Sequence, residues 1–413
     1  MITVLDSGEL EKLRHKIDAL GAPGIRLLAG IAAEHALEYH QFDLAVLSPG
    51  IDPSAPLVQQ FLKRRVTMIG ELELAYELCK CPIIGITGTN GKTTTTQLVA
   101  KMLTECGVKT AAAGNIGPAF SARVRESEEL DVMTLEISSF QLETIRRFRA
   151  ETVVWLNFAP DHLDRYATLD EYRAAKLRIF ENQTEDDWAI VNLRDSLPPL
   201  RAQKVTFSAF TAGGDFELRG GAIVFRGESV LEMKDAQLRG AHNAENLMAA
   251  LAVGWTRGLS FDAMRSPLCE YQPLPHRCEP LRTFEGVEWI NDSKGTNPDS
   301  VEKALLSETR RVVLIAGGKD KGFEYEMLTE LVSQKCRAVV TLGEMADRIA
   351  AIWRERLPVF NAGRSLEQAV QLARAQAQPG DVVLFSPGTS SFDMFKNYAD
   401  RGNQFRALVH ALH

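Results

Sequence analysis

The stretch that decides the fold is Gly-Ile-Thr-Gly-Thr-Asn-Gly-Lys-Thr-Thr, at residues 85–94. The apolar run before it, at residues 81–86, predicts a short buried strand, and residues 93–99 predict the start of a helix. Gly88 and Gly91 let the backbone turn tightly between the two. Such a turn aims several N–H groups and the positive end of a helix dipole at one point. The sequence therefore predicts a phosphate site at this turn.

Lys92 and Thr93 add the chemistry that a nucleoside triphosphate requires. Lys92 contributes a fixed positive charge, and the hydroxyl of Thr93 is the usual ligand for the magnesium ion that accompanies such a nucleotide. The loop departs from the full phosphate-loop pattern, because Ile86 stands in the place of its first glycine. The alternative is a tight turn that happens to carry a lysine, and it leaves the flanking strand and helix unexplained.

Composition places the chain among ordinary globular proteins. Its 413 residues, 45% of them hydrophobic and 24% charged, are enough for about three domains. The net charge of −7 argues against nucleic-acid binding, and no apolar run is long enough to span a membrane. The N-terminus lacks the parts of a signal peptide, and the six scattered cysteines predict reduced thiols. We therefore expect a cytoplasmic protein without membrane insertion.

Strand-like apolar runs alternate with helical stretches along the chain, which is the pattern of parallel α/β sheets. They divide into three units, at residues 1–80, 81–274 and 275–413, with a proline-containing linker at residues 271–275. Strands are expected at residues 3–6, 25–29 and within 43–50 of the first unit, and at residues 311–316, 338–342 and 381–385 of the third. The glycine-rich residues 205–235 predict antiparallel strands within the second unit.

Three side chains outside the loop are candidates for a site. Glu136 ends a predicted strand, at the end where parallel sheets bind ligands, and its carboxylate suits either Mg²⁺ or solvent. His162 lies in a polar loop after the next strand, where a ligand role competes with a structural one. Lys176 lies on a helical stretch at residues 172–180, whose default interpretation is a solvated face of lysines and arginines.

The loop at residues 85–94 resembles the ATP loop of the Mur ligase and folylpolyglutamate synthase superfamily, whose members use ATP to make amide bonds to amino acids. The resemblance implies a three-domain α/β architecture, with Rossmann-like N- and C-terminal domains and a central P-loop ATPase-like domain. It also implies an ATP site at Gly88, Thr89, Asn90, Gly91, Lys92, Thr93, Thr94, Asn243, Asn246, Arg277, Asp292 and Lys294. Read without the resemblance, Asn243 and Asn246 are helix caps.

The resemblance further implies two Mg²⁺ ions and a catalytic set. The catalytic residues it implies are Lys92, Glu136, His162 and Lys176, and the metal ligands are Thr93, Glu136, His162 and Lys176. Lys176 matches the position of a carbamylated lysine, in which CO₂ addition turns a cation into an anionic oxygen ligand. Catalysis would consist of carboxylate activation by ATP, followed by attack of an amine on the acyl phosphate.

Residues 384–398 and 401–405 resemble the D-glutamate-adding branch of the family. The substrates implied are UDP-N-acetylmuramoyl-L-alanine, D-glutamate and ATP, and the enzyme is expected to be a monomer. Substrate binding is implied for Asp6, Ser7, Gly50, Asn115, Thr296, Lys321, Ser391 and Tyr398. Read alone, Lys321 is equally an ordinary loop lysine.

The first unit begins where the resemblance predicts a second strand. A first strand, a glycine-rich turn and a helix are expected before residues 3–6, so we expect an incomplete pocket for the uridine diphosphate group. Two alternatives to the assigned function stay open. One is another Mur or folylpolyglutamate synthase-type amide ligase, and the other is a nucleotide-binding descendant without catalysis.

Overall fold

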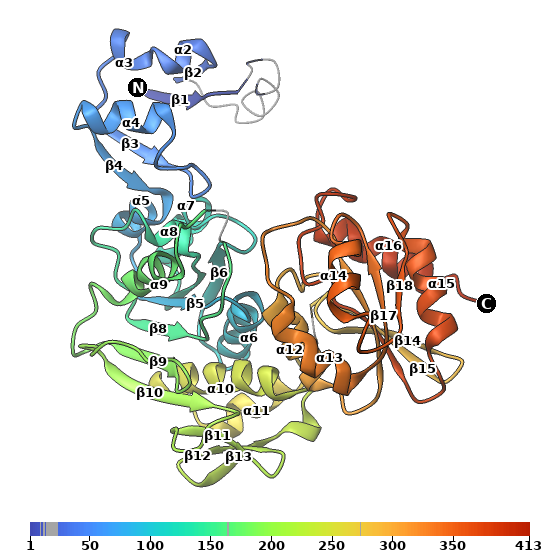
Figure 1. Ribbon diagram of the computed structural model, residues 1–413. Helices are drawn as coiled ribbons and strands as arrows, with labels where there is room; N and C mark the ends of the chain where they lie inside the picture. The colour runs from blue at the N-terminus through green and yellow to red at the C-terminus, as the bar shows by residue number, and fades with distance from the viewer. Residues whose placement is uncertain (9, 11–12, 14–23, 163–164, 273) are drawn as a thin grey trace.

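The computed structural model describes residues 1–8, 10, 13, 24–162, 165–272 and 274–413. Figure 1 shows three parts that follow one another along the chain: a small N-terminal part, a central part built on a large sheet, and a C-terminal part beside the central one. In all three parts, helices pack on mainly parallel strands, which confirms the predicted α/β fold. Within the described residues, no helix is both long and apolar enough to cross a lipid bilayer.

The N-terminal part carries two pairs of parallel strands, β1 with β2 and β3 with β4. The three strands predicted here are confirmed, whereas β4 was not predicted because its single apolar pair is too short a signal. The elements are β1 (Ile2–Asp6), β2 (Ile25–Ala29), α2 (Ile31–Glu34), α3 (Ala36–Tyr39), β3 (Leu44–Leu47), α4 (Pro56–Lys63), β4 (Thr67–Gly70) and α5 (Glu71–Leu78).

A nine-stranded sheet forms the central part, in the order β13-β12-β11-β10-β9-β8-β5-β7-β6. Its strands are parallel from β6 to β11, and β12 and β13 add the antiparallel edge predicted for residues 205–235. The strands are β5 (Ile83–Thr87), β6 (Thr110–Gly114), β7 (Val132–Glu136), β8 (Thr152–Trp155), β9 (Trp188–Asn192), β10 (Gln203–Ser208), β11 (Phe216–Arg219), β12 (Ala222–Phe225) and β13 (Glu228–Glu232).

Helices cover both faces of the central sheet. The helices are α6 (Lys92–Glu105), α7 (Phe120–Arg123), η1 (Val124–Glu128), α8 (Ser139–Leu142), α9 (Leu169–Leu177), η2 (Arg178–Phe180), η3 (Met233–Asp235), α10 (Ala241–Thr256) and α11 (Phe261–Cys269). Successive side chains of β5 point to opposite faces, so Ile84 and Ile86 pack with α6, α10 and α11, and Ile83 packs with α5, α7 and α8. Helix α10 begins at Ala241, so Asn243 and Asn246 lie within it.

The C-terminal part is a six-stranded sheet in the order β14-β15-β19-β16-β17-β18, parallel except for β14. The three predicted strands correspond to β16, β17 and β19. The elements are β14 (Glu279–Phe284), β15 (Val287–Asn291), α12 (Pro298–Ser307), β16 (Val312–Gly317), η4 (Glu326–Leu328), α13 (Thr329–Lys335), β17 (Cys336–Leu342), α14 (Ala346–Trp353), β18 (Val359–Asn361), α15 (Leu366–Gln376), β19 (Val382–Phe385) and α16 (Tyr398–His410).

The strand order of both sheets decides where ligands can bind. β5 lies between β7 and β8, so the segments that follow these three strands meet at one edge of the central sheet. In the C-terminal sheet, β19 lies between β15 and β16 and brings their carboxyl ends together in the same way. Ligands of α/β proteins usually bind outside the carboxyl ends of the strands, at the point where the strand order reverses.

Gly402 provides a stability test of the C-terminal packing. In a helix interior, alanine is favoured over glycine by about 1 kcal/mol. However, a Cβ at Gly402 would overlap the buried ring of His276, whose Nδ1 lies 2.9 Å from Asn291 Nδ2. We expect Gly402→Ala to lower the free energy of unfolding by about 1–3 kcal/mol, as overpacking does. Urea unfolding measures this change.

The exposed Gln404→Ala on the same helix serves as the control and should stay within about 0.5 kcal/mol of the parent protein. A gain in stability from Gly402→Ala would show that helix propensity outweighs the contact with His276.

Candidate active site

The loop after β5 adopts the predicted strand–turn–helix arrangement. Gly91 has φ 85°, a conformation that L side chains rarely adopt. A Cβ at this position would also lie 2.5 Å from Asn246 Oδ1 on α10. Glycine is therefore required here for two reasons, its backbone conformation and its close approach to Asn246. The missing side chain allows the loop to pack against the start of α10.

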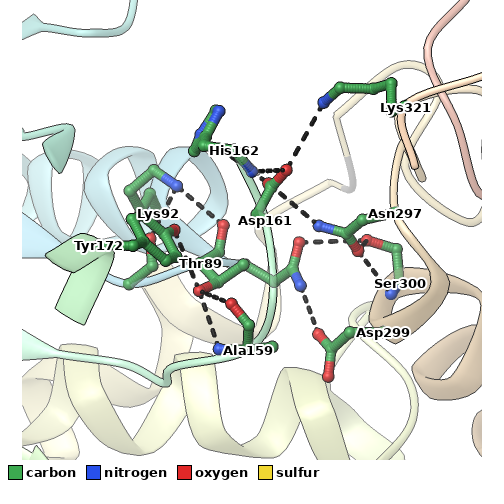
Figure 2. Close-up of polar contacts among 12 residues, drawn as sticks. Thr89, Lys92, Ala159, Asp161, His162, Tyr172, Asn297, Asp299, Ser300 and Lys321 are labelled. Carbon is green, nitrogen blue, oxygen red and sulfur yellow. Dashed lines mark hydrogen bonds and ion pairs between the residues drawn. The ribbon is translucent and has the colours of Figure 1, made fainter. Parts of the chain in front are cut away.

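Lys92 folds back over its own loop. Its Nζ donates hydrogen bonds of 2.8 Å to the carbonyl oxygens of Gly88 and Thr89 (Figure 2). Burial lowers the pKa of Lys92, and the nearby Glu136 and Asp161 act in the opposite direction. The ammonium is thus held at the loop, within a cluster of opposite charges.

Glu136 lies at the carboxyl end of β7, as predicted. Its side chain is 2% exposed, so the alternative of a surface glutamate is wrong. Asn115 Nδ2 donates to Glu136 Oε1 over 2.7 Å, whereas Glu136 Oε2 is buried without a hydrogen-bond partner among the described residues. Because an unpartnered buried carboxylate oxygen is costly, this atom marks a place for a cation or a donor.

His162 lies in the loop after β8, with φ 55°. Its ring packs against Phe140 and Tyr172, with centroids 4.8 and 5.7 Å away. Burial lowers the pKa of His162, although Asp161 opposes the shift. The imidazole is therefore neutral near pH 7, which is the form that binds metals.

Lys176 is not the solvated helix lysine of the default interpretation. Its side chain is 1% exposed, and its Nζ donates to the carbonyl oxygen of Gly88 over 2.9 Å. Burial holds the pKa of Lys176 well below its ordinary value, and the positive charge of Lys92 is the second cause of this shift. The structure thus places an amine with a weakened hold on its proton beneath the loop at residues 85–94.

The C-terminal part completes a cavity of about 260 Å³ against the loop. Asp292 follows β15 and accepts a 2.7 Å hydrogen bond from Ser386 Oγ. Burial raises the pKa of Asp292 to about 6. Burial lowers the pKa of Lys294 to about 8, and the positive charge of Arg277 adds to this shift. The Nζ atom of Lys294 lies 3.9 Å from the centre of the Tyr398 ring.

Most of the predicted site residues line this one cavity. They are Thr89, Asn90, Gly91, Lys92, Thr93, Thr94, Asn115, Glu136, His162, Asn243, Asn246, Arg277, Asp292, Lys294 and Thr296. Others lie outside its lining: Gly88 in the loop, Lys176 beneath it, Lys321, Ser391 and Tyr398 in the C-terminal part, and Asp6, Ser7 and Gly50 in the N-terminal part.

The two asparagines of α10 do not cap it, so that alternative is wrong. Neither side chain bonds a free N–H of the first turn. Asn243 Nδ2 donates to the Arg239 carbonyl over 2.9 Å, and Asn246 Oδ1 accepts from Thr95 Oγ1 over 3.1 Å. Asn246 thereby ties α10 to α6.

Sequence reasoning missed the contacts that join the two sheets (Figure 2). The side chain of Asn90 donates to Asp299 and accepts from Ser300 Oγ over 3.1 Å. Asp161 pairs with Lys321, 3.5 Å away, and accepts from Asn297 Nδ2 over 3.3 Å. The pair Asn297-Pro298 is a usual helix start and was visible in the sequence. Only the fold shows that the helix it starts, α12, contacts Asn90.

Comparison with known proteins gives two family matches, to the Mur ligase middle domain over residues 86–254 and to the Mur ligase glutamate ligase domain over residues 276–388. The UDP-N-acetylmuramoylalanine–D-glutamate ligase of Geotalea uraniireducens is 43% identical, over 96% of this chain and 91% of the relative. The enzyme of that name from Aquifex aeolicus is 40% identical, over 89% and 88%.

Solved structures share the fold at lower identity. The UDP-N-acetylmuramate–alanine ligase of Thermotoga maritima superposes with a TM-score of 0.64 at 18% identity, covering 99% of this chain and 93% of that one. A folylpolyglutamate synthase of Mycobacterium tuberculosis, complexed with ADP and AMPPCP, gives 0.61 at 17% identity, covering 81% and 94%. Likeness at this level supports the three-domain α/β architecture alone.

The raised pKa of Asp292 predicts a pH dependence of stability. The pKa of Asp292 is about 6 in the folded protein, whereas that of an unperturbed aspartate is about 3.9. The folded protein therefore binds this proton more tightly than the unfolded chain does. Its stabilising contribution is therefore complete below about pH 4 and is lost as the pH rises to about 6. We expect the free energy of unfolding of the parent protein, relative to Asp292→Asn, to fall across this window and to level off above it.

Urea unfolding between pH 4.5 and 7.5 measures the difference, with the exposed Asp262→Asn as the control. Parallel profiles for the parent protein and Asp292→Asn would show that Asp292 titrates at the same pH in both states.

Proposed function

Because this chain belongs to the Mur ligase family, we propose that it uses ATP to join D-glutamate to the L-alanyl carboxylate of UDP-N-acetylmuramoyl-L-alanine. Relatives named for this reaction are 38–43% identical over nearly the whole chain, which is the observation that carries the assignment. The reaction makes an amide bond and serves peptidoglycan synthesis. It requires an activated carboxylate, an amine and protection of the activated species from water.

ATP binds in the cavity between the central and C-terminal sheets. The N–H groups at the start of α6 and the charge of Lys92 hold its phosphates. Arg277 and Lys294 add positive charge from the other side of the cavity. Asp292 takes the ribose hydroxyls, and Asn246, already bonded to α6, lies beside the adenine.

The residues present fit Mg²⁺. Glu136 Oε2 is buried without a partner, and the hydroxyl of Thr93 lines the same cavity. The described residues hold no group of three or more His, Cys, Asp and Glu side chains that could bind a metal. Two ions therefore need further oxygen ligands, from the nucleotide and from a carbamate on Lys176, with neutral His162 as a nitrogen ligand. When bound, Mg²⁺ neutralises charge on the transferring phosphoryl group.

The chemistry follows from this arrangement in two steps. An oxygen of the L-alanyl carboxylate attacks the γ-phosphorus, the bond to ADP breaks, and an acyl phosphate forms. The D-glutamate amine then attacks the acyl carbon, loses a proton, and phosphate leaves. Lys92 stabilises the charge that develops in the first step, since it is already fixed at the loop.

D-glutamate and the nucleotide sugar are bound by the remaining candidates. Lys321, Thr296 and Ser391 hold the carboxylates of D-glutamate, with Tyr398 beside them. Lys321 already pairs with Asp161 across the two sheets. The nucleotide sugar contacts Asp6, Ser7, Gly50 and Asn115, and the enzyme acts as a monomer. Its six free cysteines suit a reducing compartment, so we place the reaction in the cytoplasm.

A substrate panel tests the function. We expect phosphate release from ATP only when UDP-N-acetylmuramoyl-L-alanine and D-glutamate are both present, because the acyl phosphate forms on the first substrate and loses its phosphate only when the amine of the second attacks it. L-glutamate, L-lysine and diaminopimelate should give rates near the background. Coupled phosphate detection measures the rates, and mass spectrometry identifies the amide product.

Release that depends on a folate and L-glutamate instead would assign the chain to the sister amide ligases. Binding of ATP without release under any combination would favour a nucleotide-binding protein without catalysis.

Lys176 gives a second test. We expect Lys176→Ala to abolish ligation and to regain part of it with added formate or acetate, which can occupy the place of the carbamate oxygens. Lys101→Ala, on the exposed side of α6, is the matched control and should keep full activity. Steady-state rates with and without the carboxylates measure the rescue. Full activity in Lys176→Arg would contradict the carbamate, because guanidinium does not form one under these conditions.

A further inference from the structure

One cation of the cavity has no role in the reaction described above. Lys303 lies on α12 and lines the same cavity as Lys92 and Arg277. Its Nζ is 2.8 Å from Asp299 Oδ2, one helical turn earlier, and the two side chains are only 15% and 16% exposed. A pair this far from water is more firmly placed than an ordinary surface ion pair.

Asp299 fixes this pair to the ATP loop. The same oxygen that faces Lys303 accepts a hydrogen bond from Asn90 Nδ2. The backbone of Asn90 is itself held at the end of β8, because its N–H donates to Asn157 Oδ1 over 2.9 Å and its carbonyl accepts from Asn157 Nδ2 over 3.0 Å. Lys303 is therefore positioned relative to the loop that holds Lys92, although it belongs to the other sheet.

The charges around Lys303 point to an anionic ligand. Burial lowers the pKa of His242 to about 4, and the positive charge of Lys303 adds to that shift, so Lys303 acts on the start of α10. Four cations line the cavity: Lys92, Arg277, Lys294 and Lys303. Three carboxylates also line it, Glu136, Asp161 and Asp292. Asp299 alone faces Lys303 at ion-pair distance among the described residues.

We propose that Lys303 is a nucleotide-binding residue, which α12 brings to the phosphates of ATP and which Asp299 and Asn90 hold in place. This assignment deepens the proposed function and rests on it. Asp299 is a positioning residue, since it acts through Lys303. Because the cation belongs to the C-terminal part, ATP affinity and the docking of α12 on the ATP loop strengthen each other by the same factor.

Binding of ADP to the full chain, measured by titration calorimetry, tests the proposal without any ligation step. We expect Lys303→Met to weaken ADP binding about tenfold, which corresponds to about 1.4 kcal/mol. Lys303→Arg, which keeps the charge, should stay within about twofold of the parent protein. The matched control is Lys101→Met, which removes the lysine of another i, i+4 ion pair, on α6 and away from the cavity. It should leave ADP binding unchanged.

A change of less than twofold in Lys303→Met would overturn the proposal. Equal losses in Lys303→Met and Lys303→Arg, with lower melting temperatures for both, would also overturn it, because they indicate a structural role. A KM for D-glutamate that stays at the parent value in Lys303→Met supports a role toward the nucleotide. A wrong amino-acid substrate would leave the ADP result standing, so the two failures are distinguishable.

Lysine acetylation of the unaltered protein gives a measurement that needs no variant. We expect ADP to protect Lys303, but not Lys101, from an acetylating reagent, as read by peptide mass spectrometry. Equal labelling of Lys303 with and without saturating ADP would overturn the proposal, even if Lys303→Met failed to fold.

Discussion

Positive charge gathered at one cavity is the constraint around which this structure is built. Lys92 and Lys176 approach the ATP loop from one sheet, and Arg277 and Lys294 approach it from the other. Each cation has lost water and repels the others, so carbonyl oxygens and carboxylates must lie close by. The carbonyl of Gly88 accepts from both lysines of the central part. The parallel strand order meets this demand, because it brings the carboxyl ends of several strands to one place.

The same constraint explains why the two sheets touch through polar side chains. Asn90 bonds to two neighbouring residues of α12, and Asp161 bonds to Asn297 and pairs with Lys321. An apolar interface would hold the C-terminal part in one position whether or not substrates were present. A few polar contacts at the mouth of the cavity are weaker and exchange readily with water. Under the proposed mechanism, such contacts would suit a C-terminal part that closes over the acyl phosphate and opens again to release product.

Local parts of the fold were predictable from the sequence, and long-range parts were not. The loop at residues 85–94 carries its own strand, glycines and helix start, so its geometry follows from neighbouring residues. Glu136 was predictable because it ends an apolar run. The burial of Lys176 was not, because its helix has the composition of a solvated face and only the packing under Gly88 buries it. The contact of Asp299 with the loop carried no signal, because its partner Asn90 lies 209 residues away in the sequence.

Burial shifts five titrating groups of the site toward their neutral forms, whereas the pKa of Asp161 is lowered despite its burial. The pKa values of Lys92, Lys176, Lys294 and His162 are lowered, and that of Asp292 is raised. A polyanionic nucleotide reverses this for the lysines, since its phosphates favour their charged forms. Binding of the nucleotide and protonation of the lysines are therefore linked. Only the neutral form of a lysine amine can react with CO₂, so the burial that lowers the pKa of Lys176 favours the carbamate proposed above.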